Sequence, residues 1–351
     1  MIDTLRILAK IDKETYEKVH AQSKIQKSFS AKTGEIFYEI TSDHIEGSFS
    51  SKLFYRVFPK GDKYGFQDDY IIILEGSVHK LVFGQNAYNG LYDLEFVVLY
   101  LKSLLESAFC VQLPSYENWY LLRVDIAKCF DLNIQDRVCK YINCLSNLEF
   151  PRRNLKYYKD SCLYFTGTTT TLKIYNKLLE FRTHDKSKLV KSGDFNVPEH
   201  EEKIKGLVRF EVEIKKKKLL SIYEKLRNIV VKDVKCCDFN YEILNCVWCD
   251  EFMKVLKLNY SDLEKISDKE TVKRRLVHIH GTSYGNTLYS FYLSLLVDGC
   301  KDVRKNTSKS TYYRKINQLK EAGVDFVSNK ISVVYNNQSD FVDIFKMKEV
   351  V

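Results

Sequence analysis

Proline and long apolar runs are both scarce in this sequence. Only four of the 351 residues are proline, which argues against a stiff proline-rich linker between domains. No segment approaches the roughly 18 to 20 consecutive apolar residues that a membrane-spanning helix requires, and the apolar run from Phe96 to Leu101 is far shorter. The start of the sequence also lacks the basic and apolar regions of a secretory signal. We therefore expect a cytoplasmic protein without a membrane segment.

A large excess of charge of one sign is absent as well. Lys and Arg number 55 and Asp and Glu 46, and the formal net charge of +9 suits a polyanionic partner without requiring one. The ten cysteines are spread along the chain rather than concentrated in a small framework, so we expect them to be reduced. With 45% hydrophobic and 29% charged residues, the chain should be globular and long enough for two domains.

Alternating and β-branched segments dominate the first two thirds of the chain. They predict strands over residues 35–41, 52–58, 70–75, 120–130, 162–166, 172–178 and 207–214. Asp93 is suited to cap a helix whose apolar side chains recur at helical spacing from Leu94 to Leu105. The polar stretch 182–205 is expected to be a surface helix and loop joining two neighbouring strands. Residues 1–230 are therefore predicted to form an α+β domain with a mostly antiparallel sheet flanked by helices.

Helical patterns take over after residue 215, and residues 231–351 are predicted to form a mainly helical domain. Helices are expected over Leu288–Val297 and Lys309–Ala322, separated by Gly299 and a polar, basic connector. The second helix begins like the recognition helix of a helix-turn-helix, although a basic helix face is often only solvated. Its candidate DNA contacts are Lys309, Ser310, Tyr312, Tyr313, Arg314 and Lys315.

One predicted strand places a tyrosine between two lysines. Because side chains alternate along a strand, Lys173, Tyr175 and Lys177 should share a face. A free phenol has a pKa of about 10, so a basic neighbourhood or a metal must help to stabilise its anion before it can act as a nucleophile. The pattern therefore fits a tyrosine nucleophile acting on phosphate, and it also fits an ordinary solvated strand face.

Two other predicted strands carry carboxylates at the same spacing. Arg123 and Asp125 should share one face of the first strand. Arg209, Glu211 and Glu213 should share one face of the second strand. The candidate ligands for Mg²⁺ or Mn²⁺ are Asp125, Glu211 and Glu213. This interpretation requires the three strands to be neighbours in the sheet.

The order of these motifs resembles the filamentous-phage gene II replication proteins and their plasmid and prophage relatives. The resemblance is carried by the Arg-x-Asp strand, the Thr-rich hairpin that ends in Tyr175-x-Lys177, and the segment from Gly206 to Glu211 followed by Ile214-Lys215. Weaker patches extend it over residues 1 to about 325, and the early ones are Met1-Ile2-Asp3, Glu75-Gly76-Ser77, Lys80, Gly84 and Asn86.

The resemblance implies a site-specific initiator of rolling-circle replication. Tyr175 would attack one phosphodiester of the origin, giving a 5′-phosphotyrosyl bond and a free 3′-hydroxyl primer, and the same chemistry would later join the ends. Asp125 and Glu211 would bind Mg²⁺ or Mn²⁺, while Glu213 and Glu180 are further ligand candidates. The residues implied to contact DNA near the cut are Arg123, Lys173, Lys177 and Arg209. Expected partners are origin DNA and the host helicase and polymerase.

Three alternatives stay open at this point. The chain is also compatible with a non-catalytic DNA-binding regulator of a phage or plasmid. His278-Ile279-His280 has the form by which histidine-dependent relaxases and transposases bind a metal, although its surroundings look helical. The cysteines at 236, 237, 246 and 249 could form a zinc site, but their spacing is unusual for one and the intervening apolar residues look like core.

Overall fold

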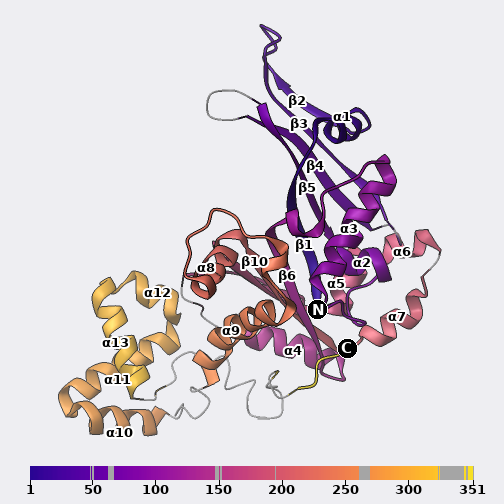
Figure 1. Cartoon of the computed structure of the whole chain (residues 1–351). Coiled ribbons are helices and arrows are strands. Elements are labelled where there is room, and N and C mark those ends of the chain that lie inside the picture. Colours follow the sequence, from indigo (N-terminus) through magenta and orange to yellow (C-terminus); the bar gives the residue numbers. More distant parts are fainter. Residues whose placement is uncertain are drawn as a thin grey trace. The chain divides into compact units, whose positions relative to one another are not determined.

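The computed structural model describes residues 1–47, 49, 51–61, 67–146, 150, 152–193, 195–260, 269–322, 324, 344 and 347–350. Two compact units make up the chain (Figure 1). The first, here called the sheet unit, comprises Met1–Ile142, Pro151–Glu251 and Ile344–Val351. The second, the helical unit, comprises Asn143–Phe150 and Phe252–Asp343. The functional division into residues 1–230 and 231–351 stays a prediction.

Ten strands of the described chain form one sheet, in the order β2-β3-β4-β5-β1-β6-β10-β9-β8-β7. Neighbouring strands pair antiparallel throughout. The strands are β1 (Ile2–Ile11), β2 (Ile25–Phe29), β3 (Ile36–Glu46), β4 (Lys52–Gly61), β5 (Gln67–Ser77), β6 (Tyr120–Asp131), β7 (Asn154–Tyr158), β8 (Cys162–Thr166), β9 (Thr170–Asn176) and β10 (Leu207–Lys215). The predicted α+β class, with an antiparallel sheet followed by a mainly helical region, is confirmed.

Helices connect and cover these strands. They are α1 (Lys13–Ala21), α2 (Val78–Phe83), α3 (Leu94–Phe109), α4 (Gln135–Leu145), α5 (Lys177–His184), α6 (Lys186–Ser192), α7 (Val197–Ile204), α8 (Lys216–Arg227) and α9 (Tyr241–Tyr260). As predicted, the Asp93 side chain caps α3 by accepting hydrogen bonds from the backbone amides of Glu95 and Phe96. The segment between the neighbouring strands β9 and β10 contains α5, α6 and α7, where one helix and a loop were expected.

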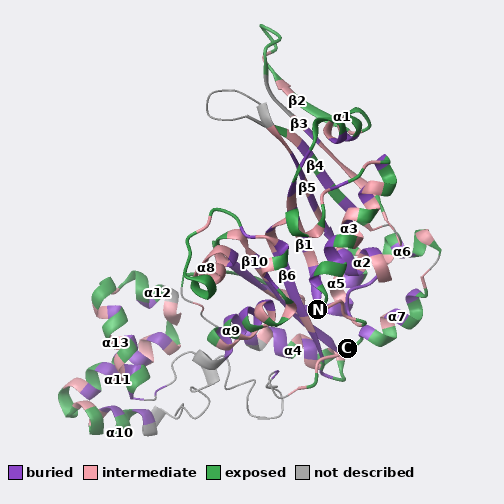
Figure 2. Cartoon of the chain, in the orientation of Figure 1, coloured by how far each residue is buried: buried purple, intermediate pink, exposed green. Residues whose placement is uncertain are grey.

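The central strands have one apolar face and one polar face. On the apolar face, Phe210 of β10 packs near Tyr141 of α4, and the indole of Trp248 in α9 donates a hydrogen bond to the Phe210 carbonyl. Alternation then places Arg209 and Glu211 on the opposite face, together with Asp125 of β6. Figure 2 shows that the strands in the middle of the sheet are largely buried. The charged side chains of this second face are therefore held in a largely dehydrated setting.

Strand β9 ends two residues earlier than predicted, at Asn176 instead of residue 178. The Asn176 side chain accepts a hydrogen bond from the Leu179 amide and caps α5, so Lys177 is the first residue of that helix. The expectation that Lys177 continues the strand face of Lys173 and Tyr175 is therefore wrong. Its ammonium reaches the same region from the helix, because Nζ lies 2.6 Å from Asn86 Oδ1.

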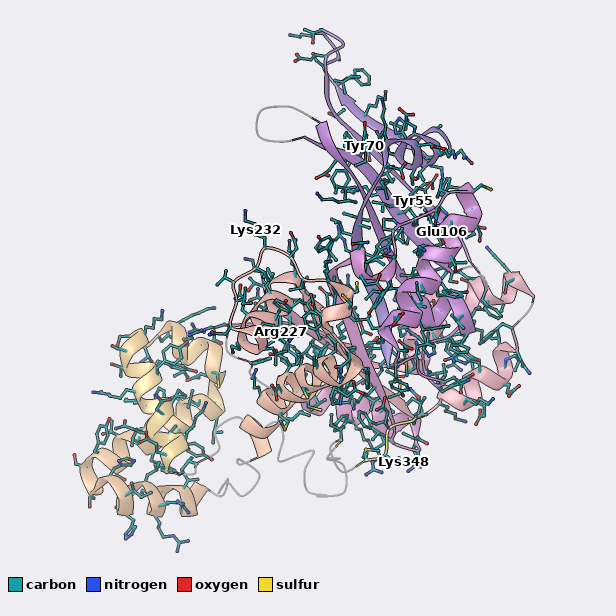
Figure 3. All side chains as sticks on the ribbon, viewed as in Figure 1. Tyr55, Tyr70, Glu106, Arg227, Lys232 and Lys348 are labelled. Atoms are coloured by element: carbon teal, nitrogen blue, oxygen red, sulfur yellow. The ribbon has the colours of Figure 1, made fainter. Side chains whose placement is uncertain are left out.

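Strands β2 to β5 extend the sheet beyond β1, on the side away from β6 and β10. Tyr55 of β4, which is labelled in Figure 3, is buried there. Its hydroxyl lies 2.8 Å from Ser23 Oγ, and its ring is edge-on to that of Phe109 in α3. Helices α1 and α3 thus supply the apolar layer for this part of the sheet.

The helical unit contains α10 (Lys269–His280), α11 (Thr282–Val297), α12 (Gly299–Lys305) and α13 (Lys309–Glu321). Its core includes Leu276, Leu288, Tyr292, Ile316 and Leu319. The polar connector expected between the two sequence-predicted helices is mostly the short helix α12. None of the helices in the described ranges is long and apolar enough to cross a membrane.

Candidate active site

The three strands that carry the candidate site residues are neighbours in the sheet. Strand β10 lies between β6 and β9, with Glu213 opposite Asp125, and Glu211 opposite Lys173. Arg209 is opposite Tyr175. Directly opposed residues of antiparallel strands project to the same face, so the adjacency required by the sequence analysis is confirmed.

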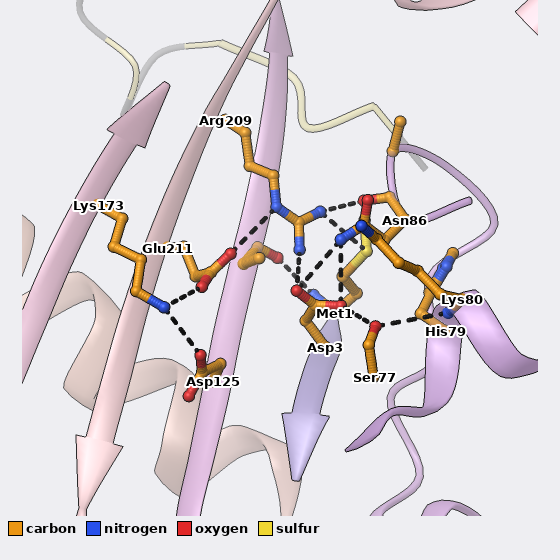
Figure 4. A network of polar contacts seen from close by, with 12 residues as sticks. Met1, Asp3, Ser77, His79, Lys80, Asn86, Asp125, Lys173, Arg209 and Glu211 are labelled. Atoms are coloured by element: carbon orange, nitrogen blue, oxygen red, sulfur yellow. Dashed lines mark hydrogen bonds and ion pairs between the residues drawn. The ribbon is translucent and has the colours of Figure 1, made fainter. Parts of the chain in front are cut away.

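Lys173 lies at the centre of the three candidate ligand carboxylates. Its Nζ is 2.8 Å from Glu211 Oε1, 3.1 Å from Asp125 Oδ2 and 3.4 Å from Glu213 Oε2 (Figure 4 shows the first two). Burial opposes the charged form of Lys173, but the carboxylates of Glu211 and Asp125 outweigh it and raise the pKa of the ammonium above its usual range. We call Asp125, Glu211, Glu213 and Lys173 the carboxylate cluster. Its lysine holds together three negative charges that would otherwise repel one another.

Tyr175 is joined to the carboxylate cluster through its hydroxyl. Its Oη donates a hydrogen bond of 2.9 Å to Glu211 Oε2, and the Arg209 guanidinium carbon lies 6.0 Å from the ring centre. Burial holds the pKa of Tyr175 well above its usual value, although Arg209 acts in the opposite direction. Only 8% of the residue is exposed. In this arrangement Tyr175 is a neutral phenol with an ionised acceptor.

The two carboxylates nearest Lys173 differ in their ionisation. Burial raises the pKa of Asp125 to about 7, against the opposing effects of Arg123 and Lys173. Burial also disfavours the charged form of Glu211, but Lys173 and Arg209 outweigh it and hold the pKa of this carboxyl below its usual range. Glu211 is therefore ionised while Lys173 and Arg209 are paired with it, and Asp125 is the member whose charge changes near neutral pH.

Arg123 orients Asp125 from the neighbouring position on the face. Its Nε and Nη2 donate hydrogen bonds of 2.7 Å and 2.6 Å to the two carboxylate oxygens of Asp125. The same guanidinium lies 3.3 Å from Glu75 on β5 and 3.3 Å from Glu213. A bidentate contact of this kind fixes the plane of the carboxylate.

A second charged group adjoins the carboxylate cluster, and sequence reasoning missed that it pairs Arg209 with Asp3. Arg209 is fully buried, and its Nη2 lies 2.8 Å from Asp3 Oδ2 on β1, while its Nη1 donates to the Asn86 carbonyl (Figure 4). Ser77 Oγ donates to Asp3 at 2.6 Å. Asp3, Ser77 and Asn86 are among the early residues that matched the family pattern, so the structure brings those separate patches to one place. The signal available in the sequence was Asp3 itself, which is the single acidic residue of β1.

Lys177 and Glu180 form the far side of this network. Lys177 is almost fully buried, and its ammonium contacts Asn86 and, at 2.5 Å, Glu180 Oε2. Burial opposes ionisation of Glu180, but Lys177 and Lys80 outweigh it and lower the pKa of the carboxyl to about 2. The charges of Lys177 and Arg209 are thus directed at protein carboxylates here, and their assignment to DNA phosphates stays a prediction.

The chemistry of the carboxylate cluster fits a hard divalent ion. Two or three carboxylate oxygens facing one point are typical ligands for Mg²⁺ or Mn²⁺. In the described part of the chain, however, no group of three or more His, Cys, Asp or Glu side chains is arranged to hold a metal as it stands. The central point is taken by Lys173. Because Mg²⁺ binds oxygen at about 2.1 Å, an ion there would have to replace this ammonium and draw the carboxylates inward.

The helical unit places only part of the predicted recognition set on its surface. Tyr312 is buried against Phe291, whereas Tyr313 is 43% exposed with Arg304 above its ring. Lys315 is half-buried, with its ammonium over the Phe291 ring. The other members of the set, Lys309, Ser310 and Arg314, are exposed on α13. The outward face of this helix is therefore basic at its first turns.

The histidine and cysteine motifs have not formed metal clusters within the described residues. His278 and His280 lie at the end of helix α10. Residues two apart on a helix point to different sides, so this pair lacks the shared face that a strand would give it. Cys236 is buried, whereas Cys237 and Cys246 are exposed and Cys249 is half-buried.

Comparison with known proteins gave one family. The family model for the N-terminal part of the replication-associated protein encoded by phage gene II matches residues 1–235. The matched segment contains the carboxylate cluster, Tyr175, and the buried pair of Asp3 and Arg209. The same comparisons found no matching curated protein and no matching solved structure.

Proposed function

Because the chain belongs to the gene II-type family of phage replication-associated proteins, a family of replication initiators, we propose that it nicks one DNA strand at an origin to start rolling-circle replication. The family match confirms the resemblance to gene II-type initiators. In the proposal, Tyr175 is the nucleophile and the carboxylate cluster is the centre that assists it. The observation that carries this assignment is the hydrogen bond between Tyr175 and Glu211 on the charged face of the sheet.

The proposed reaction is a transesterification. The Tyr175 oxygen attacks the phosphorus of one phosphodiester, and the bond from phosphorus to the 3′ oxygen breaks. The 5′ phosphate stays joined to the tyrosine, and the 3′ oxygen takes up a proton and becomes the primer end on which a host polymerase and helicase would act. Glu211 accepts the phenolic proton, because it already accepts the hydrogen bond from that hydroxyl. Attack by a 3′-hydroxyl on the phosphotyrosine reverses these steps and joins the ends.

Two neighbouring cations assist this chemistry in the proposal. Arg209, beside the Tyr175 ring, stabilises negative charge on the phenolic oxygen. Lys173, which is 18% exposed, moves from the carboxylate cluster to the incoming phosphate. Mg²⁺ or Mn²⁺ held by Asp125 and Glu211, with Glu213 nearby, would neutralise charge on that phosphate.

Origin recognition is assigned to the helical unit. Helix α13 presents Lys309, Ser310, Tyr313 and Arg314 to solvent, which fits contacts with phosphates and base edges of duplex DNA. A cut at one site requires recognition of the surrounding duplex, so a separate recognition helix complements the nicking centre.

The burial of Tyr175 supports one alternative function, a non-catalytic DNA-binding regulator. With 8% of the residue exposed and Lys173 filling the carboxylate cluster, the described arrangement also suits a DNA-binding regulator that has kept the family's fold without its reaction. Such a protein would bind origin DNA specifically and leave it uncut with either ion.

A nicking assay distinguishes these functions. Its substrate is a supercoiled plasmid that carries the origin region of the genetic element encoding the protein. With Mg²⁺ or Mn²⁺, the wild type should give open circles and a covalent protein–DNA adduct, and Tyr175→Phe should give neither. Tyr55→Phe is the matched control, because it removes a buried hydroxyl of the same sheet outside the charged network. Normal nicking by Tyr175→Phe contradicts the proposal. Loss of nicking in the double variant His278→Ala, His280→Ala would instead support a histidine-dependent enzyme.

A further inference from the structure

The charged face of the sheet continues beyond Tyr175 onto β8 and β7. In the paired strands, Tyr164 is opposite Lys173, and Lys156 is opposite Tyr164. In the next row, Cys162 is opposite Tyr175, and Tyr158 is opposite Cys162. Since opposed residues share a face, Lys156, Tyr158 and Tyr164 lie on the same face as the nucleophile. We call these three residues the tyrosine face.

The tyrosine face is open to solvent at the end of the sheet. Strand β7 is the last strand in the described sheet, and all five of its residues are exposed. Tyr158 is 56% exposed, and its ring lies edge-on to that of Tyr164, with centres 6.3 Å apart. On the other side of β7, Tyr157 is opposite the buried Leu163 and continues the apolar face. An exposed aromatic ring on the polar side therefore has no role in the core.

The lysines of this region differ from Lys173 in their surroundings. Lys156 and the nearby Lys159 are exposed, and neither forms an ion pair with a carboxylate of the described residues. The carboxylate cluster, in contrast, contains three acidic side chains and one lysine. A DNA backbone that approaches the nucleophile is therefore attracted at β7, whereas Lys173 and Arg209 beside the nucleophile are already paired with protein carboxylates.

We propose that the single strand next to the nicked phosphodiester lies across β8 and β7, with a base stacked on Tyr158 and its phosphates near Lys156 and Lys159. Exposed aromatic rings beside lysines are how proteins hold unpaired bases without reading their sequence. Strands are spaced at about 4.8 Å, so β7 lies about 10 Å from β9. The stacked base is thus only a few nucleotides from the phosphate that reacts. The role of this surface in nicking rests on the proposed function, whereas its binding of single-stranded DNA does not.

Binding can be measured apart from cleavage in the full-length Tyr175→Phe chain. The probe is fluorescein-labelled oligothymidylate of about 20 nucleotides, longer than the strand that one such surface usually covers. Adding Tyr158→Ala to this chain should weaken DNA binding about fivefold or more. A fivefold loss corresponds to the lower end of the binding free energy that one stacked base contributes. Tyr158→Phe, which keeps the ring, should bind normally. Tyr157→Ala is the matched control, because it removes a ring from the other side of the same strand.

Photocrosslinking gives a readout that does not depend on DNA contacts elsewhere in the chain. The same oligonucleotide carrying iododeoxyuridine should form an adduct on a peptide containing Tyr158, located by mass spectrometry. Equal affinity of Tyr158→Ala and its parent, with no adduct on this peptide, would overturn the proposal. Nicking by Tyr175→Phe would refute the proposed function and leave this binding result unaffected, so the two failures can be told apart.

Discussion

The hydroxyl of Tyr175 donates a 2.9 Å hydrogen bond to Glu211 across two paired strands. If Glu211 takes the phenolic proton, Glu211→Gln should slow nicking of the origin plasmid by about a hundredfold or more, because a positioned general base contributes about 10² to 10⁴ in rate. The measurement is the initial rate at which open circles form with Mg²⁺ or Mn²⁺. Specific binding of uncut origin DNA should persist, since recognition is assigned to α13.

The pH dependence of the residual activity distinguishes a base from a purely structural partner. A variant that lacks the base should regain rate as pH rises, because hydroxide can then remove the phenolic proton in its place. Melting temperatures of Glu211→Gln and the wild type must be compared first, since the substitution leaves Lys173 with one anionic partner fewer. A folded Glu211→Gln protein that nicks at the wild-type rate would remove Glu211 from the mechanism.

Lys173 should compete with a divalent ion for the carboxylate cluster. Lys173→Met removes the ammonium while keeping a long side chain, and the three carboxylates then repel one another. We expect the variant to melt at a lower temperature in EDTA and to be stabilised by Mn²⁺ more than the wild type is. Isothermal titration calorimetry should show about tenfold tighter Mn²⁺ binding, which corresponds to about 1.4 kcal/mol.

Lys80→Met is the control for this competition. Lys80 is also paired with carboxylates, Glu180 and Asp185, but it lies outside the carboxylate cluster. Its loss should leave Mn²⁺ affinity unchanged. If Lys173→Met binds Mn²⁺ no more tightly than the wild type and gains no stability from the ion, the proposed metal ligands are wrong.

The ionisation of Asp125 predicts a change in stability near neutral pH. Its pKa is raised to about 7 by burial, above the value of about 3.9 expected in the unfolded chain. The folded protein therefore holds an extra proton between these values, and the stability that this proton provides is lost as pH rises through about 7. Urea unfolding in EDTA at pH 5 and pH 8 should show this loss in the wild type. Asp125→Asn, which cannot ionise, should lose less, and an equal loss would contradict the assignment.

Strand periodicity was sufficient to predict the part of the site that depends on alternation. Lys173, Tyr175, Arg209 and Glu211 lie on one face because residues two apart in a strand must do so. Their adjacency to Asp125 depended on the order of strands, which the local pattern does not determine. The metal-site interpretation only required that the strands be neighbours, and the register shows that they are.

The parts that could not be predicted depend on capping and tertiary packing. Asn176 caps α5 and turns Lys177 out of the strand, a result that a Tyr-Asn-Lys sequence read as a strand does not indicate. Asp3 meets Arg209 only because β1 and β10 both flank β6. Likewise, the placement of Lys173 between three carboxylates follows from side-chain packing across strands, so a sequence reading treats those carboxylates as free for a metal.

The buried ion pair between Arg209 and Asp3 should contribute to stability as a pair rather than as two separate charges. Asp3→Ala removes one of the carboxylates that balance the charge of the fully buried Arg209, so the free energy of unfolding should fall by about 3 to 5 kcal/mol. Arg209→Met removes the other charge and should also destabilise, because Asp3 is then buried with only neutral partners. The double variant should lose less unfolding free energy than the two single variants lose together, since no isolated charge is left. Denaturation curves of the four proteins measure this coupling. Strictly additive losses would show that Asp3 does not balance the charge beside Tyr175.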